Sequence, residues 1–362
     1  MDGIDKKTLK KIEKIISPYY FGVTKWTIIS LAGILGNMFR FKKRSKLSRE
    51  EKQNIIRDYF SLSSKDRRGF KDTQIIENIF KGYVEEVLRK EGFCSKSFNW
   101  PIFPPLCFKL VDPPAIVIVS PRDKLECSRS FLLKSDLSAE SIEGMENQID
   151  NLGVSSWIGR VGGLSLFPFM VSKHGDCQWT LTAIIHEWVH HFLFSRTRIG
   201  FFYLLEFLIP NRISRQLKIN PREVRLINEG LADFISQELA EKIFLNFPEL
   251  WGNQIKEKKG NGFFQDLIAV RQKVEEYLSS REVDEAENYM KEMAGIFLEK
   301  SKYFKESVRK LNQASLSFLG NYEEANPLMP KFKKIRDKCS SLKEFLKRIK
   351  KVKSVKDLEK IN

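Results

Sequence analysis

The chain has 362 residues, 42% of them hydrophobic, which is enough to bury a core in one large domain or two. Its formal net charge is +16, but no aromatic-basic platform or recognised DNA-binding motif accompanies that charge, so nucleic acid is disfavoured as a partner. The five cysteines are scattered without a C-x-x-C pair, which argues against a disulfide framework or a thiolate metal site and favours a reducing, cytoplasmic compartment.

Residues 1–70 predict a helical, basic N-terminal region. Its apolar run, residues 26–39, is shorter than the roughly 20 residues needed to span a bilayer. Basic residues at both ends suit a helix that lies at a membrane interface, although a helix buried in the core is the more frequent alternative. No cleavable signal peptide is predicted, because the run begins after residue 20 and lacks a small-residue cleavage site.

The next part of the chain mixes helices with a small amount of strand. Helices are predicted over residues 70–92 and 136–152, and one clear strand over residues 115–119. The glycine-rich stretch 162–171 is a candidate edge strand, because Pro168 cannot donate a hydrogen bond to a neighbouring strand. An ordinary core strand is an equal alternative.

A helix with unusual polar residues follows. The segment 179–194 is apolar on nearly every side, which predicts a buried helix with Thr180 or Asp176 at its N-cap. Inside it, His186 and His190 stand four residues apart in an H-E-x-x-H pattern. Four residues make slightly more than one helical turn, so the two imidazoles lie on one face and can bind one zinc ion per chain.

The glutamate of the pattern has its own place on the helix. Glu187 lies about 100° round from His186, within reach of a water on that metal, where it can act as a general base. The alternative is a buried helix with two satisfied histidines, but unpartnered polar groups in such a helix would be costly.

A third protein ligand is needed, and no further histidine follows at a short fixed spacing. Residues 226–235 predict a second helix in which Glu229 comes 39 residues after His190, with Asp233 one turn further on the same face. Taken alone, such a pair is typical of a solvated helix face. Together with the first motif, it predicts Glu229 as the third ligand and Asp233 as the residue that orients a bound imidazole.

These motifs resemble the gluzincin metallopeptidases, whose third zinc ligand is a glutamate on a helix. The stretch 162–171 with Trp179 and residues 186–193 is similar to an uncharacterised prokaryotic family of predicted zinc peptidases, and residues 119–123 also resemble that family. The likeness covers roughly residues 80–240. The chain departs from it at Phe167, where a tyrosine is expected, so no role of that tyrosine is carried over.

The resemblance implies roles for residues of both motifs and of the strand before them. His186, His190 and Glu229 correspond to the zinc ligands and Glu187 to the general base. Gluzincins also run an edge strand above the zinc, with which the substrate backbone pairs. The residues expected to contact a substrate there are Gly163, Leu164 and Ser165.

Other polar residues near the motifs are weaker candidates. His191 is rotated off the metal face and is expected to pack or to lie at the surface. His174, in the loop before the helix, is expected to be an ordinary loop histidine. Tyr203, Tyr289 or Arg225 could polarise a substrate carbonyl, and the sequence does not choose among them. The apolar stretch 201–210 could be a lid, a specificity element or a membrane-touching loop.

After residue 222 the chain reads as helical, over residues 222–246, 262–279, 282–313 and 331–358, with a break near residues 340–341. Residues 331–362 hold 13 Lys and Arg against 4 Asp and Glu, a net of +9. Their apolar positions recur in steps of three and four, which predicts an amphipathic basic segment. A solvated face that covers the domain is the first interpretation, and an anionic membrane surface is the second.

The predicted fold class is α+β, a mostly helical zincin-like domain with a small sheet, an active-site helix and a second helix that carries the glutamate. Its parts are the N-terminal region 1–70, a catalytic core 71–245 and a helical C-terminal extension 246–362. The predicted function is a zinc-dependent hydrolase, foremost a metallopeptidase acting on a peptide or protein. The alternatives are a non-catalytic module stabilised by zinc and a membrane-associated interaction protein. Substrate specificity and oligomeric state are not readable from the sequence.

Overall fold

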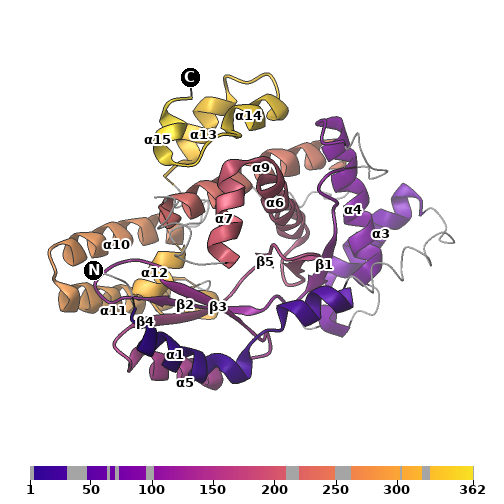
Figure 1. Ribbon diagram of the computed structural model, residues 1–362. Coiled ribbons are helices and arrows are strands. Elements are labelled where there is room, and N and C mark those ends of the chain that lie inside the picture. Colours follow the sequence, from indigo (N-terminus) through magenta and orange to yellow (C-terminus); the bar gives the residue numbers. More distant parts are fainter. Residues whose placement is uncertain are drawn as a thin grey trace. The chain divides into compact units, whose positions relative to one another are not determined.

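The computed structural model describes residues 4–30, 47–62, 66–69, 73–94, 102–208, 220–248, 262–301, 304–319 and 327–361. Over these residues the chain is mostly helical and its strands form two three-stranded sheets, which confirms the α+β class (Figure 1). The chain divides into two compact units, each assembled from three separate segments. The predicted three-part organisation follows chain order instead and stays a prediction.

Unit 1 comprises Met1–Phe21, Pro114–Val161 and Lys258–Pro327. Its antiparallel sheet has the strand order β3-β2-β4, with β2 at Ala115–Ser120, β3 at Arg129–Leu133 and β4 at Ser155–Arg160. Only β2 was predicted.

Both faces of this sheet are covered by helices, because successive residues of a strand point to opposite sides. Val117 and Val119 of β2 pack in a core with α1 (Lys6–Ile16) and α5 (Ala139–Asp150). On the alternate face, Ile118 packs with Trp157 and Ala314, and Ala314 belongs to α12 (Gln313–Leu319).

The rest of unit 1 is a pair of helices, α10 (Gly262–Ser279) and α11 (Val283–Lys300), followed by a π-helix at Phe304–Val308. The predicted continuous helix over residues 282–313 is therefore wrong. The α-helix α11 ends at Lys300, and after the π-helix the chain bends at Arg309, which adopts a positive φ of 63°. Tertiary bonds hold this bend, among them one of 2.8 Å from the Trp157 indole N–H to the carbonyl of Val308.

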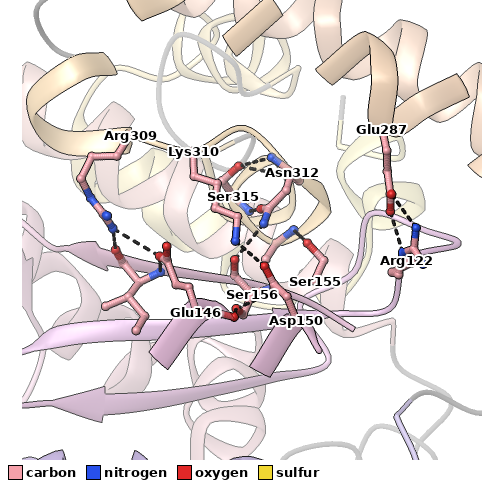
Figure 2. A network of polar contacts seen from close by, with 12 residues as sticks. Arg122, Glu146, Asp150, Ser155, Ser156, Glu287, Arg309, Lys310, Asn312 and Ser315 are labelled. Carbon is pink, nitrogen blue, oxygen red and sulfur yellow. Dashed lines mark hydrogen bonds and ion pairs between the residues drawn. The ribbon is translucent and has the colours of Figure 1, made fainter. Parts of the chain in front are cut away.

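Just after that bend, residues 309–315 attach to α5 and β4 through a network of polar side chains (Figure 2). Arg309 lies 3.3 Å from the buried Glu146 and donates to the carbonyl of Ile158 at 2.6 Å. Lys310 pairs with Asp150, which also accepts from the backbone and hydroxyl of Ser156 at 2.8 and 2.7 Å. The network joins segments that are distant in the sequence.

Unit 2 comprises Gly22–Pro113, Gly162–Glu257 and Leu328–Asn362. Its sheet has the order β1-β6-β5, with β1 (Phe108–Val111) parallel to β6 (Phe169–Ser172) and the short β5 (Gly163–Leu164) antiparallel to β6. The predicted strand 162–171 is thus two strands joined by a turn that contains Pro168. Its first half is the edge strand and its second half lies at the centre of the sheet.

Three helices pack together beside this sheet: α6 (Cys177–Arg196), α7 (Arg198–Leu208) and α9 (Pro221–Asn246). Asp176 caps α6, accepting from the backbone N–H of Trp179 at 2.7 Å, so the second of the two predicted caps is correct. α7 follows α6 closely, and Gly200 makes that approach feasible, because a Cβ there would lie 2.2 Å from the backbone of Leu193.

The loop that leads into α6 is held by a buried arginine. Arg67 lies in a short 3₁₀ segment, Asp66–Gly69, and donates to the carbonyls of Lys173 at 3.1 Å and Gly175 at 2.6 Å. Its guanidinium also stacks over the ring of Phe60, at the end of α3 (Arg49–Ser61). These bonds fix the start of α6 from outside its own sequence.

The remaining helical parts flank these elements. α4 (Thr73–Lys90) packs on α9 and β1. Residues 23–30 are helical, and the rest of the apolar run 26–39 lies outside the described residues. Among the helices described, none has the length and apolar composition required to cross a membrane.

The basic C-terminal segment consists of three short helices, α13 (Met329–Arg336), α14 (Leu342–Ile349) and α15 (Val355–Glu359). The break near residues 340–341 is confirmed, and a second break follows α14. The apolar side of the segment is buried in the core of unit 2, where Phe332 and Phe345 contact Phe234 of α9. The exposed side is rich in lysine, as the solvated-face interpretation predicts; binding to an anionic membrane stays a prediction.

Candidate metal centre

Three potential ligand atoms converge between α6 and α9. The Nε2 atoms of His186 and His190 lie 3.0 Å apart, and Oε2 of Glu229 lies 3.5 Å from each of them. A tetrahedral ion with bonds of about 2.0–2.1 Å spaces its ligands about 3.3 Å apart, close to the sides of this triangle. The three side chains are the one group in the described part of the chain whose donor atoms could hold a metal ion.

The other nitrogen of each imidazole is also held by α9. Nδ1 of His186 lies 2.8 Å from Oδ1 of Asp233, and Nδ1 of His190 lies 2.7 Å from the side-chain amide of Asn228. A metal-binding imidazole must carry its proton on the nitrogen remote from the metal, so each Nδ1 needs an acceptor. Asp233 is such an acceptor.

Asn228 fits the same requirement once its amide is turned over. The amide nitrogen faces His190, and the amide oxygen is buried without a hydrogen-bond partner. The two ends of an asparagine amide are assigned from the hydrogen-bond network and can be exchanged by a rotation of 180°. With the oxygen toward His190, Nδ1–H would donate to it, and His190 would present Nε2 to an ion.

The two carboxylate oxygens of Glu229 have different partners, because Tyr203 of α7 binds one of them. Its hydroxyl donates to Oε1 at 2.7 Å, whereas Oε2 faces the two imidazoles. The tyrosine ring also lies parallel to the ring of His190, with centroids 5.5 Å apart. Glu229 is thereby oriented to offer a single oxygen.

Glu187 of α6 lies against the edge strand β5 and the residue that follows it. The hydroxyl of Ser165 donates to its Oε2 in a short hydrogen bond. At Gly163 of β5 a Cβ would lie 2.2 Å from Oε1, so only glycine allows the strand to pass this close to the carboxylate. The edge strand and the predicted base are in direct contact.

The charges of this site do not balance. Glu187 and Glu229 are buried or nearly so, and no lysine or arginine forms an ion pair with either carboxylate among the described residues. Burial alone would lower the pKa of His186, but Asp233 and Glu229 raise it well above its ordinary value.

The two carboxylates respond differently to their surroundings. Burial would raise the pKa of Glu229, but the two imidazoles bring that pKa well below its ordinary value, so it is ionised. Burial raises the pKa of Glu187, only partly opposed by the imidazoles and Ser165. A carboxylate with a raised pKa is better suited to accept a proton near neutral pH.

Most predicted site residues therefore lie together, and the weaker candidates separate from them. The Nε2 atom of His191 donates a hydrogen bond to the carbonyl oxygen of Ser165 at 3.3 Å, and burial lowers the pKa of His191. His174 pairs with Asp112 at 2.6 Å in the loop before α6. Tyr289 belongs to α11 of unit 1.

The roles of Asn228 and Tyr203 became visible only in the structure. Asn228 was part of the second motif but had no predicted role, and asparagine beside glutamate carries no signal of its own. Tyr203 was one of three candidates for a different task. Leu164 lies in β5 as predicted, although none of its side-chain contacts ties it to the site.

The donor set fits zinc better than a hard cation, because two imidazoles and one carboxylate are its usual catalytic ligands, whereas magnesium and calcium prefer oxygen. Comparisons with protein families, with curated proteins and with solved structures find no match for this chain.

Proposed function

We propose that the chain is a zinc-dependent hydrolase that cleaves peptide bonds. The observation that carries the proposal is the triangle of two Nε2 atoms and one carboxylate oxygen, with sides of 3.0, 3.5 and 3.5 Å and with no lysine or arginine paired to that carboxylate in the described residues. A divalent cation would fit between these three ligand atoms and would balance the negative charge of the buried carboxylates. His186, His190 and Glu229 would hold one ion per chain.

Each orienting contact supports a catalytic ion rather than a purely structural one. Asp233 and Asn228 hold the two imidazoles, and Tyr203 restricts Glu229 to one oxygen. Three protein ligands leave a coordination position open, which a structural zinc site does not. Glu187 beside that position argues against a non-catalytic module, because a structural site does not require it.

The proposed mechanism assigns the proton transfers to Glu187. When bound, zinc would lower the pKa of a water and polarise the substrate carbonyl. Glu187 would accept a proton from the water that attacks the carbonyl carbon and would then pass that proton to the leaving nitrogen. Ser165 orients the carboxylate through its hydrogen bond.

The arrangement of elements is also the basis for proposing a zincin-like fold of the gluzincin type for unit 2. α6 carries the two histidines, α9 carries the glutamate, and the edge strand β5 contacts the general base. A substrate backbone would add to the outer edge of β5 (Gly163–Leu164), next to Ser165.

The decisive experiment combines metal analysis with Glu187→Gln. The protein, loaded with zinc and desalted, should hold about one zinc per chain. Glu187→Gln should keep that zinc and the fold, yet cleave a mixed peptide library about a hundred to ten thousand times more slowly, as expected on loss of a general base.

His174→Gln provides a matched control, because this histidine pairs with Asp112 outside the ligand group and should affect neither zinc nor cleavage. Equal cleavage by wild type and Glu187→Gln would contradict the mechanism. A wild-type protein that binds zinc but cleaves nothing would favour the non-catalytic module.

A further inference from the structure

The exposed aromatic side chains of the described chain are not evenly distributed. Five aromatic residues are among the exposed large hydrophobic residues, and four of them lie on α6, on α7 or on the turn between β5 and β6: Phe167, Trp179, Phe194 and Phe201. Large exposed apolar groups that gather in one region are typical of binding surfaces. Two of these four, Trp179 and Phe167, lie near opposite ends of β5, the strand whose Gly163 lies against Glu187.

Trp179 is held in place at the first end. A Cβ on Gly162 would lie 2.6 Å from its ring, and a Cβ on Gly175 would lie 1.9 Å from it. The indole therefore packs between two glycine backbones, which no other residue type would permit. It is nonetheless 40% exposed. A rigid, half-exposed aromatic ring has little conformational entropy to lose on binding.

Phe167 occupies the second end, in the turn after β5. The centroid of its ring lies 6.1 Å from that of His191, and His191 is hydrogen-bonded to the carbonyl of Ser165. Phe167 is 38% exposed. Both aromatic residues are thus close in the chain or in space to the residues that contact Glu187: Gly162 precedes Gly163, and Phe167 follows Ser165 by two positions.

We infer that Trp179 and Phe167 form two apolar subsites, one on each side of the general base. The substrate would then be an extended peptide segment with large apolar side chains on both sides of the cleaved bond. This inference rests on the proposed function for the position of the cleaved bond, but the preference for apolar peptides does not. Backbone pairing with β5 would align the segment, because side chains two residues apart on an added strand point to the same face.

The test measures binding separately from cleavage. Zinc-loaded Glu187→Gln is titrated with two fluorescent decapeptides, one with Phe and Leu at its central positions and one with Ser and Gln there. The apolar peptide should bind at least about tenfold more tightly, the scale of discrimination that apolar pockets provide. In the same background, Trp179→Ala and Phe167→Ala should each reduce that preference several-fold.

Tyr20→Ala is the matched control, because Tyr20 is 39% exposed and stacks on Phe131 in unit 1. It should leave the preference unchanged. Trp179→Phe, which keeps a ring, should retain more of the preference than Trp179→Ala, and this separates a lost contact from a disturbed fold. Zinc content and thermal unfolding are measured for every variant.

Equal affinity for the two peptides, or an unchanged preference in both alanine variants, would overturn the inference. Apolar preference in binding together with no cleavage by wild type would support the subsites and contradict the hydrolase. Cleavage by wild type of apolar and polar sequences alike would support the hydrolase and contradict the subsites.

Discussion

The polar network of unit 1 and the metal-binding group of unit 2 both bury carboxylates, but they differ in the source of the compensating positive charge. In unit 1, Glu146 faces Arg309 and Asp150 faces Lys310, while Glu287 of α11 accepts two hydrogen bonds from Arg122 at 2.7 and 2.5 Å (Figure 2). Each of these acids has a cationic partner from the chain itself.

The group in unit 2 lacks such partners. Glu229 and Glu187 contact histidine, tyrosine, serine and glycine, and no lysine or arginine is paired with either in the described residues. The difference separates a structural network whose charges are balanced within the chain from a group whose charge the proposed metal ion would balance. Charge balance, rather than burial or hydrogen bonding alone, distinguishes the two.

The largest effect should follow from loss of a ligand. His190→Ala leaves two of three protein ligands and should weaken zinc binding by on the order of a thousandfold. Competition with a chromogenic chelator measures the affinity. His191→Ala, one residue further along α6, should keep the zinc. If His190→Ala bound zinc as well as wild type, the metal centre would have to lie elsewhere.

The network of unit 1 should respond in stability and not in metal content. Arg309→Gln leaves Glu146 with the backbone N–H of Ile158 as a donor but without its cation, and should destabilise folding by about 3 kcal/mol. Urea unfolding measures this loss. The double variant with Glu146→Gln removes the buried charge as well and should recover part of it. If the double variant were no more stable than Arg309→Gln, the unpaired charge of Glu146 would not be the cause of the lost stability.

Residues that orient the imidazoles should have an intermediate effect. Asp233→Ala and Asn228→Ala each remove an acceptor from an Nδ1 and should weaken zinc binding by about ten- to a hundredfold without abolishing it. Asn228→Asp keeps an acceptor toward His190 and should retain more affinity than Asn228→Ala. Equal affinities for these two Asn228 variants would count against the proposed amide orientation.

Tyr203→Phe should change how Glu229 binds rather than whether it binds. Without the hydroxyl, Oε1 is released and a second oxygen can approach the ion. In the cobalt-substituted protein, the visible absorption should weaken, since a higher coordination number replaces a tetrahedral one. Tyr289→Phe, in unit 1, should leave that spectrum unchanged. A wild-type spectrum for Tyr203→Phe would exclude this role.

The smallest effect is expected at the half-exposed pair of Arg122 and Glu287. The hydrogen bonds from Arg122 lower the pKa of Glu287 below its ordinary value of 4.5. The pair therefore stabilises folding above pH 4.5, and this contribution is lost as the pH falls through the lowered pKa of the folded state. Arg122→Gln should cost about 0.5–1 kcal/mol at pH 7, and the difference from wild type should disappear in acid. A difference independent of pH would point to lost packing instead.

Local sequence was sufficient for the elements whose pattern is continuous. The helices α6, α9 and α10 and the strand β2 follow from apolar periodicity, capping residues and a run of β-branched residues. The spacing of His186 and His190 predicted one shared face, because helix geometry depends only on local bonds. Glu229 was predicted from the need for a third ligand, and the structure groups it with the two histidines; its binding of zinc stays a prediction.

Helices and strands that depend on residues distant in the sequence were either not predicted or were predicted to be longer than they are. β3 and β4 have no strong pattern of their own and exist because they pair with β2. The helix predicted over residues 282–313 ends at Lys300, and the chain beyond it is held by tertiary bonds such as that from the Trp157 indole N–H to the carbonyl of Val308. The strand 162–171 divides because its second half pairs with β1.

The sequence by itself thus determined which side chains could bind a metal ion, and that a further glutamate would lie next to them on the same helix. Tertiary structure decided the rest, namely that Tyr203 restricts Glu229 to one oxygen, that Asn228 faces His190, and that β5 touches Glu187. The physical reason is the separation along the sequence of the residues that interact. Helical spacing is set by bonds between near neighbours, whereas these contacts are set by how α7, α9 and β5 pack around α6.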